Sequence, residues 1–185
     1  MNDYYRQKQF LAQVDEQDNI IGQVEKWEAH KRGVLHRGYT AILQFQENIV
    51  LQHRKHPVFD DVYDFSFSSH QLFIDGKVQS DEEAIYEGLK REWGINKFQI
   101  SHLKFLNKIY YKAKDQKSEY TEHEIDYIYV ITLNTSPQAN LEYAYGQKIV
   151  TAKDLGSSIK HLSSPFAPWV EKILEYVSEN NGLTR

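Results

Sequence analysis

The chain has 185 residues, of which 41% are hydrophobic and 26% charged, with no cysteine and a formal net charge of −4 at pH 7. This composition is typical of a folded protein, and the length predicts one domain spanning residues 1–185. The absence of cysteine excludes disulfides and thiolate metal sites, and the weak acidic charge excludes a broad positive field for nucleic acid or anionic membranes.

The N-terminal segment, MNDYYRQKQF, lacks the apolar run of a secretion signal. No later segment approaches the roughly 20 apolar residues that cross a bilayer. We therefore expect a cytoplasmic protein with neither nucleic acid nor a membrane as a partner. The sequence leaves the oligomeric state open.

The first part of the chain has the alternation of apolar and polar residues that is typical of strands. Residues 10–25 alternate loosely around the turn-forming pair Asp18 and Asn19, which predicts a short hairpin. Residues 38–46 and 48–53 predict two more strands, and a further strand is predicted by the aromatic run VYDFSFSSHQLF. Its two faces are expected to carry alternate residues, with Tyr63, Phe65 and Phe67 on one and Asp64, Ser66 and Ser68 on the other.

A helix is predicted over residues 81–93, with Ser80 or Asp81 as its N-cap and Gly94 at its end. Four elements are expected after it: strands over residues 104–112 and 125–133, a short helix near residues 152–159 and an amphipathic helix over residues 168–177. Together the elements predict an α/β fold in which helices cover both faces of a mixed central sheet.

The sharpest candidate for chemistry is the tripeptide Glu122-His123-Glu124. Alternate residues of a strand project from the same face, so the two carboxylates are placed to bind one cation. The alternative is an exposed strand edge with solvated charges, which an isolated pair of this kind fits more often. His123 is expected to point away from both carboxylates.

Three histidines are candidates to join these carboxylates. His30 and His36 flank the start of a strand, and His70 ends another. Imidazole together with carboxylate is a ligand set suited to manganese, zinc or iron. The alternative is that these are ordinary surface or core residues, since the chain has eight histidines in all.

One further acid and three basic residues are candidates for binding. Glu92 lies one turn beyond Gly88, where a small residue lets a ligand or a backbone approach closely. The alternative is an ordinary helix surface. Lys26, Arg54 and Lys55 are candidates for a phosphate clasp, with solvated surface cations as the alternative.

Taken in order, these segments resemble the Nudix superfamily and, more narrowly, type I isopentenyl-diphosphate isomerases, over most of the chain. The entry segment of that family is similar to VDEQDNIIGQVEKWEAHKRGVLHRGYTAIL, which carries Lys26, His30 and His36. Its Cys-Gly-His-Pro element resembles SSHQLF, which carries His70, and its Glu-x-Glu motif resembles TEHEID. The motif that precedes its last helix resembles SPFAPW.

The resemblance implies a Nudix-type α/β/α sandwich that binds a divalent metal beside a small-molecule diphosphate. The implied metal ligands are His30, His36, His70, Glu122 and Glu124. Glu92 falls on the glutamate that helps to bind magnesium with the substrate diphosphate, and Tyr111 lines the site. The implied phosphate ligands are Lys26, Arg54 and Lys55, or His56 in place of Lys55. Mg²⁺ or Mn²⁺ is the expected cofactor, and Zn²⁺ also suits the histidine and glutamate ligands.

Three departures from the family pattern affect the chemistry. The Nudix box requires Arg-Glu-x-x-Glu-Glu, and only its last acid is kept, as Glu92. Diphosphate hydrolysis relies on several carboxylates and is therefore disfavoured. Ser68 stands where the family has its catalytic cysteine, and a hydroxyl is a far weaker acid than a thiol of pKa around 8.5. Ser164 stands in place of a tryptophan that shields the carbocation.

The leading hypothesis is an isopentenyl-diphosphate isomerase-like enzyme, in which Glu124 and Tyr111 are candidate acid–base groups and Ser68 is a substituted proton donor. A weak or altered isomerisation fits these departures. The second hypothesis is a Nudix hydrolase that cleaves a nucleotide or another metabolite diphosphate. The third is a non-catalytic module that binds such a ligand.

Overall fold

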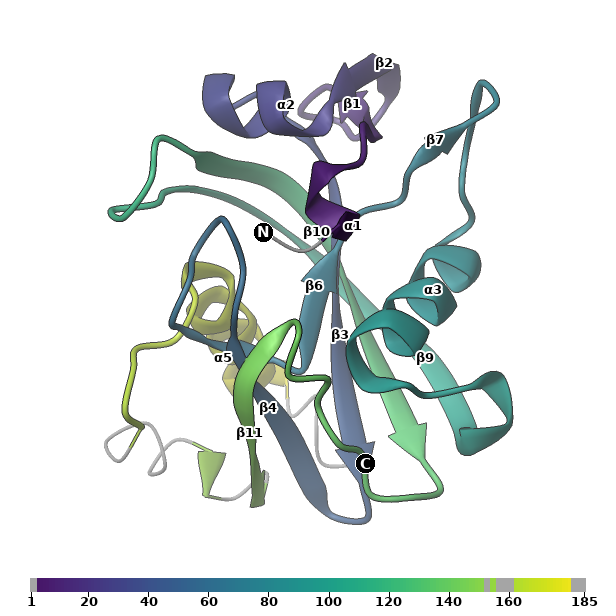
Figure 1. Cartoon of the computed structure of the whole chain (residues 1–185), viewed down its shortest axis with the longest axis vertical. Coiled ribbons are helices and arrows are strands. Elements are labelled where there is room, and N and C mark those ends of the chain that lie inside the picture. Colours follow the sequence, from purple (N-terminus) through teal and green to yellow (C-terminus); the bar gives the residue numbers. More distant parts are fainter. Residues whose placement is uncertain (1–2, 152–153, 156–161, 181–185) are drawn as a thin grey trace.

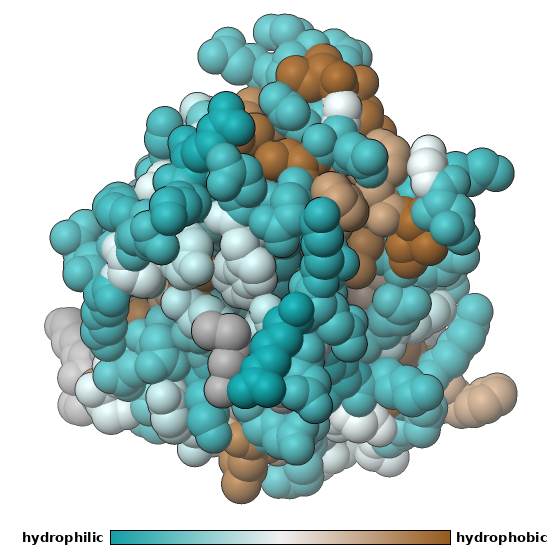
Figure 2. Space-filling view, turned by 45° about the horizontal axis from the view of Figure 1, so that its top comes forward, coloured by the Kyte–Doolittle hydropathy of each residue, from teal (hydrophilic) through white to brown (hydrophobic). Residues whose placement is uncertain are grey.

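A computed structural model describes residues 3–151, 154–155 and 162–180 of the chain (Figure 1). Within these residues, no helix combines the length and the hydropathy needed to cross a membrane. The face shown in Figure 2 is mainly hydrophilic, and its apolar side chains form separate patches. Apolar surface on this face is therefore scattered rather than gathered into one broad patch.

A mixed sheet forms the centre of the fold and draws strands from most of the chain. Its strands are β1 (Phe10–Val14), β2 (Ile20–Glu25), β3 (His36–Phe45), β4 (Asn48–Arg54), β5 (Tyr63–Phe65), β6 (Phe67–Ser69), β9 (Ile100–Lys114), β10 (Thr121–Leu133) and β11 (Ala144–Thr151). β3 and β10 run parallel, and the other strand pairs are antiparallel. A separate short hairpin joins β7 (Phe73–Ile74) to β8 (Lys77–Val78).

Two helices cover the two faces of the sheet, because alternate strand residues build an apolar core on each face. One core is completed by α5 (Pro168–Asn180) and the other by α3 (Asp81–Trp93). Neighbouring residues of one strand consequently belong to different cores, as Ile42 and Leu43 of β3 do. Figure 1 shows α3 and α5 on opposite sides of the sheet, which confirms the predicted α/β/α arrangement.

Both ends of α3 are set by local sequence, and the predicted bounds are confirmed. Ser80 is the N-cap of a capping box, and Gly94 ends the helix with a φ of 62°. A Cβ added at Gly88 would lie 2.5 Å from the Phe67 ring and 2.6 Å from the Tyr39 hydroxyl. Gly88 therefore lets the helix lie close against the sheet and does not open space for a ligand.

The strand predicted over the aromatic run needs one correction, because it is broken at Ser66. Ser66 has a φ of 57°, and its hydroxyl donates to the Val50 carbonyl and accepts from the Leu43 N–H. The break separates β5, which pairs with β4, from β6, which pairs with β3. Phe65 and Phe67 consequently lie in the two different cores rather than on one face.

The remaining predictions of strands and of the last helix agree with the structure to within a few residues at each end. Several elements were not predicted from the sequence: α1 (Asp3–Arg6), α2 (Lys26–Arg32), the 3₁₀ turn η1 (Lys97–Gln99), β11 and the β7–β8 hairpin. The helix predicted near residues 152–159 lies largely outside the described residues.

Candidate metal centre

The pairing of β3 with β10 sets the first candidate ligands side by side. Glu124 lies opposite His36 in this register, and Glu122 shares the face of Glu124. His70 follows β6, which pairs with β3, and His30 lies in the last turn of α2. Segments far apart in the sequence thus deliver all five side chains to one end of the sheet.

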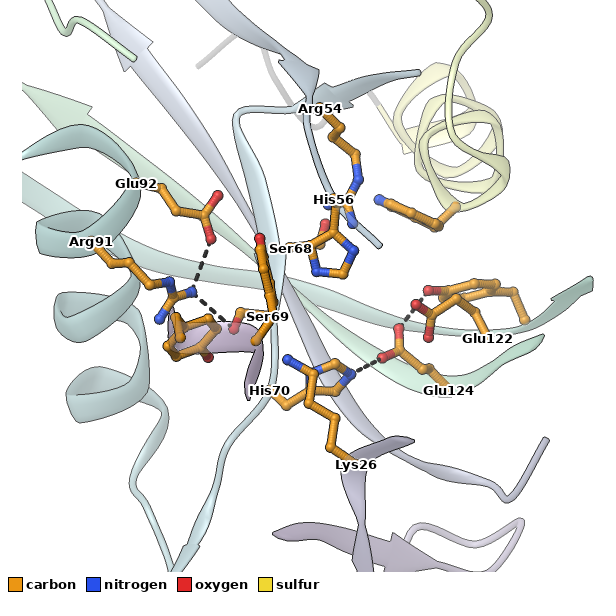
Figure 3. Close-up of a pocket in the computed structure, with 14 residues that line it drawn as sticks. Lys26, Arg54, His56, Ser68, Ser69, His70, Arg91, Glu92, Glu122 and Glu124 are labelled. Carbon is orange, nitrogen blue, oxygen red and sulfur yellow. Dashed lines mark hydrogen bonds and ion pairs between the residues drawn. The ribbon is translucent and has the colours of Figure 1, made fainter. Parts of the chain in front are cut away.

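Three imidazoles and two carboxylates meet there in a buried cluster, of which Figure 3 shows His70, Glu122 and Glu124. His36 Nε2 lies 3.3 Å from His70 Nε2, and both atoms lie within 3.3 Å of Glu124 Oε1. His30 Nε2 lies 3.1 Å from Glu122 Oε2. Ligand atoms of His30, His36, His70 and Glu122 all lie within 4.8 Å of one another.

Backbone hydrogen bonds orient two of the imidazoles toward the cluster. His30 Nδ1 donates to the Lys26 carbonyl at 2.6 Å, and His36 Nδ1 donates to the Val34 carbonyl at 2.7 Å. A neutral ring then presents an unprotonated Nε2, the form that binds a metal. Among the described residues, His30 Nε2 and Glu122 Oε2 are buried and face each other at 3.1 Å with no other hydrogen-bond partner. Lone pairs and carboxylates that face each other in this way fit a divalent cation.

Glu124 has one oxygen in the cluster and the other on Tyr111. Oε1 faces His36 and His70, whereas Oε2 accepts from the Tyr111 hydroxyl at 2.5 Å. Gly38 of β3 makes room for this carboxylate, because a Cβ at that position would lie 2.4 Å from Glu124 Oε1. Glycine at position 38 is therefore required for Glu124 to lie where it does.

Burial and neighbouring groups set the protonation of the cluster. Burial lowers the pKa of His70 to about 4, so this imidazole is neutral near pH 7. Burial opposes the charge on Glu124, but the adjacent His36 and His70 hold the pKa of Glu124 well below its usual range. Burial also raises the pKa of Tyr111 well above its ordinary value. Neutral imidazole and ionised carboxylate are the forms that bind metals.

A pocket beside the cluster is lined by three cationic side chains, Lys26, Arg54 and Arg91 (Figure 3). Lys26 is 2% exposed, and its Nζ donates to Gln9 Oε1 at 3.3 Å and lies over the Tyr4 ring. Within the described part of the chain, no carboxylate forms an ion pair with Lys26, and burial lowers its pKa. A buried cation of this kind is costly by itself and is stabilised by a bound anion.

Each of the two arginines is tied to an acid. Arg54 Nη1 donates to Asp64 at 2.9 Å, and Arg91 Nη2 donates to Glu92 at 2.9 Å and to the Ser69 hydroxyl at 3.2 Å. Among the described residues, Nε of each arginine is buried without a hydrogen-bond partner. Both guanidinium groups therefore keep donor capacity that their acids do not use.

Glu92 lines the same pocket but does not belong to the metal cluster. Its two oxygens accept from Arg91 and from Gln52. Figure 3 shows Glu92 and Arg91 on one side of the pocket, with Glu122 and Glu124 on the other. The role of Glu92 in binding a metal together with a diphosphate stays a prediction.

Ser68 also lines the pocket and belongs to a buried network of hydroxyl and carboxyl groups. Its hydroxyl lies 2.8 Å from Thr40 Oγ1 and 3.2 Å from Asp64 Oδ1. Thr40 Oγ1 in turn donates to Asp126 Oδ2 at 2.8 Å. Burial and the neighbouring Glu124 raise the pKa of Asp126 well above its ordinary value. Ser68 is thus held by polar groups on the side away from the pocket.

Three other predicted positions lie away from the cluster. Lys55 is exposed, donates to the Leu141 carbonyl at 3.3 Å and lines a neighbouring surface hollow, so the structure does not bring it to the phosphate clasp. Ser164 donates to Asp61 and does not line the pocket. His123 contacts the Gly33 carbonyl instead of the cluster, as expected.

Several pocket residues were missed in the sequence. They are Tyr4, Tyr5, Ser69, Arg91 and Trp169. Asp126 was also missed, although it continues the alternation of Glu122 and Glu124, and this period of two could have found it. Tyr4 and Tyr5 belong to α1, a helix of four residues that carries no periodic signal.

No protein-family profile matches the chain. Curated relatives are isopentenyl-diphosphate isomerases. The isopentenyl-diphosphate Delta-isomerase 1 of Mesocricetus auratus is 31% identical over 92% of this chain and 84% of its own length. An isopentenyl-diphosphate delta-isomerase of Gibberella zeae is 32% identical over 86% of this chain and 70% of its own length.

Solved structures with the same fold have lower identity. Protein DR0079 of Deinococcus radiodurans has a TM-score of 0.65 at 18% identity and covers 90% of this chain and 98% of its own. A MutT NUDIX hydrolase of Burkholderia pseudomallei has a TM-score of 0.55 at 16% identity and covers 76% of this chain and 96% of its own. The structures show the fold and the curated relatives show the family. The chain therefore belongs to the isopentenyl-diphosphate isomerase family of enzymes, built on the Nudix fold.

Proposed function

We propose that this chain is a metal-dependent isomerase that moves the double bond of isopentenyl diphosphate or of a close analogue. The observation that carries the proposal is a buried cluster of histidine and glutamate beside a pocket lined by three cations. Imidazole and carboxylate suit a divalent metal, and lysine and arginine suit a diphosphate. The metal and the diphosphate of such a complex thus have separate, adjoining binding sites.

The proposed metal ligands are His30, His36, His70, Glu122 and Glu124. A divalent ion bound there would supply a fixed positive charge beside the pocket; Mn²⁺ or Zn²⁺ suits the imidazoles, and Mg²⁺ suits the diphosphate. The chain's own contribution is to orient the rings through their Nδ1 atoms and to keep Glu124 ionised. This preorganisation lets the cluster bind a cation without rearranging.

Isomerisation adds a proton to one alkene carbon and removes a proton from another carbon. Tyr111 donates to Glu124 Oε2, so this pair is a candidate to take a proton from the substrate or to return one. Ser68 lies at a different place in the same pocket and is the candidate donor. Because a hydroxyl is a weak acid, we expect the isomerisation to be slow.

The diphosphate is proposed to contact Lys26, Arg54 and Arg91. Lys26 has no carboxylate partner among the described residues, and both arginines keep an unused Nε–H. The space that the walls enclose is about 20 Å³. Tyr4 and Tyr5 of α1 form part of the wall of this space.

The structure favours isomerisation over hydrolysis because α3 directs few acids to the pocket. Glu92 lines the pocket, whereas Glu82, Glu83 and Glu87 are exposed. Metal-assisted hydrolysis needs several carboxylates to hold metals and to position water. Glu92 alone, already bonded to Gln52 and Arg91, does not provide such a group.

The proposal is tested by incubating the protein with Mg²⁺ or Mn²⁺ and isopentenyl diphosphate while following the allylic isomer and released phosphate. Ser68→Cys should raise the rate on the order of 10²-fold, because a thiol is a better proton donor. Ser69→Cys is the matched control, since it places a thiol at the neighbouring position of the same pocket. We expect no such gain from it.

Absence of the allylic isomer with both the unaltered protein and Ser68→Cys would contradict the proposal. Phosphate release from nucleoside diphosphate derivatives would then indicate a hydrolase. Binding of these ligands without turnover would indicate a non-catalytic module.

A further inference from the structure

The carboxylate of Asp64 contacts three side chains that line the pocket. Asp64 lies in β5 and is fully buried. Its Oδ2 accepts from Arg54 Nη1 at 2.9 Å, and its Oδ1 accepts from Trp169 Nε1 at 2.8 Å and from the Ser68 hydroxyl at 3.2 Å. Arg54, Ser68 and Trp169 all line the pocket, whereas Asp64 lies behind them.

These three donors come from three separate elements of the fold, β4, β6 and α5. The Arg54 guanidinium also lies 5.1 Å from the Trp169 ring, so Asp64 sets the position of both members of this stack. A buried carboxylate is stable only when its hydrogen bonds are satisfied. Movement of one donor therefore disturbs the carboxylate and, through it, the other two.

We propose that Asp64 is a positioning residue that couples the diphosphate end of the pocket to the proton-transfer end. This inference rests on the proposed function, in which Arg54 contacts the diphosphate and Ser68 supplies the proton. Arg54 and Ser68 bind different oxygens of one carboxylate. A diphosphate that draws Arg54 into its bound position consequently also sets the orientation of the Ser68 hydroxyl.

A matched control distinguishes positioning from ordinary structural support. Asp18 is also buried, with 8% of its surface exposed, and accepts hydrogen bonds from Arg37, Lys108 and Tyr127. None of these three donors lines the pocket. Asp18→Asn and Asp64→Asn should both lower the melting temperature, and only Asp64→Asn should change ligand binding.

The first experiment measures the binding of inorganic pyrophosphate by calorimetry in the presence of Mg²⁺. Asp64→Asn keeps an acceptor for Ser68 and Trp169 but places an amide where Arg54 needs an anion. We expect about tenfold weaker binding, the scale of one charge-assisted hydrogen bond, and no change for Asp18→Asn. Equal or tighter binding by Asp64→Asn would show that Asp64 merely neutralises Arg54 and would overturn the inference.

The second experiment measures kcat and KM for isopentenyl diphosphate. Asp64→Asn should lower kcat by at least about tenfold, because Arg54 no longer holds the side chain at position 64 in place and the acceptor that orients Ser68 shifts with it. A change in KM alone would argue against the coupling. If the unaltered protein does not turn over isopentenyl diphosphate, the proposed function fails, while the pyrophosphate comparison still decides the role of Asp64.

Trp169→Phe provides a second route if Asp64→Asn does not fold. It removes one donor from Asp64 and keeps an aromatic ring beside Arg54. Among the donors that the structure describes, Asp64 Oδ1 then accepts from Ser68 alone, which should let Asp64 and Arg54 shift, so pyrophosphate should bind about fivefold more weakly. Unchanged pyrophosphate affinity in this folded variant would contradict the proposed coupling.

Discussion

Gly38→Ala tests how closely Glu124 is held in the metal cluster. The added Cβ would lie 2.4 Å from Glu124 Oε1, whereas ordinary van der Waals contact begins at 3.4 Å. The carboxylate must therefore withdraw by about 1 Å. Gly38 is not among the residues with positive φ, so alanine adds no backbone strain and the effect falls on Glu124.

Withdrawal of Glu124 disturbs its contacts with His36, His70 and Tyr111. We expect an overpacking cost of about 1–3 kcal/mol in the free energy of unfolding. At about 2–4 °C per kcal/mol for a chain of this size, the melting temperature falls by about 2–12 °C. Affinity for Mn²⁺ should fall about 10- to 100-fold, as is typical when a supporting contact of a metal site is lost.

Calorimetric titration with Mn²⁺ and thermal melting measure these two effects. Gly146→Ala is the control, because a Cβ there meets nothing within 4 Å. The double variant Gly38→Ala, Glu124→Ala removes the clash and should regain part of the lost stability while Mn²⁺ still binds weakly. Unaltered Mn²⁺ affinity in Gly38→Ala would refute the placement of Glu124 among the ligands.

Two further predictions concern the ligands themselves. Lys26→Met should weaken pyrophosphate binding by at least about tenfold, measured by calorimetry, without lowering the melting temperature, because it removes a costly buried cation. Lys55→Met is its control, and equal losses in both variants would contradict the assignment. Mn²⁺ at about 100 times its Kd should stabilise the fold by about 2.7 kcal/mol, which raises the melting temperature by about 5–11 °C. A chelator should reverse this rise, and a rise that survives in His70→Ala would place the ion elsewhere.

Helix-capping and strand-alternation rules predicted the parts of the fold that are determined by neighbouring residues. The bounds of α3 follow from Ser80 and Gly94, which act through hydrogen bonds within their own turns. The common face of Glu122 and Glu124 follows from strand alternation alone. α3 carries Glu92, and β10 carries Glu122 and Glu124. These candidate ligands could therefore be predicted from local sequence.

The remaining features depend on partners distant in the sequence. Ser66 takes its positive φ because its hydroxyl bonds to Val50 and Leu43 on other strands. No local sequence pattern predicts the resulting break between β5 and β6. Arg91 was missed as a pocket residue because it looks like ordinary helix surface until the Tyr4 ring is placed 4.0 Å from its guanidinium. Tertiary contacts, rather than local preference, decide both positions.

Lys55 is different, because its position was open to prediction. Arg54 ends β4 and projects into the pocket, and consecutive residues of an extended segment project to opposite sides. The alternation that placed Glu122 and Glu124 together also separates Arg54 from Lys55. The resemblance to a family motif had assigned Arg54 to phosphate together with Lys55 or His56, and of these two His56 lines the pocket.

The most direct test of the account is the anomalous scattering of manganese in a crystal of the protein grown with Mn²⁺ and pyrophosphate. We expect one manganese peak among His30, His36, His70, Glu122 and Glu124, with pyrophosphate against Lys26 and Arg54. A crystal with manganese bound elsewhere, or with this cluster empty at saturating Mn²⁺, would contradict it.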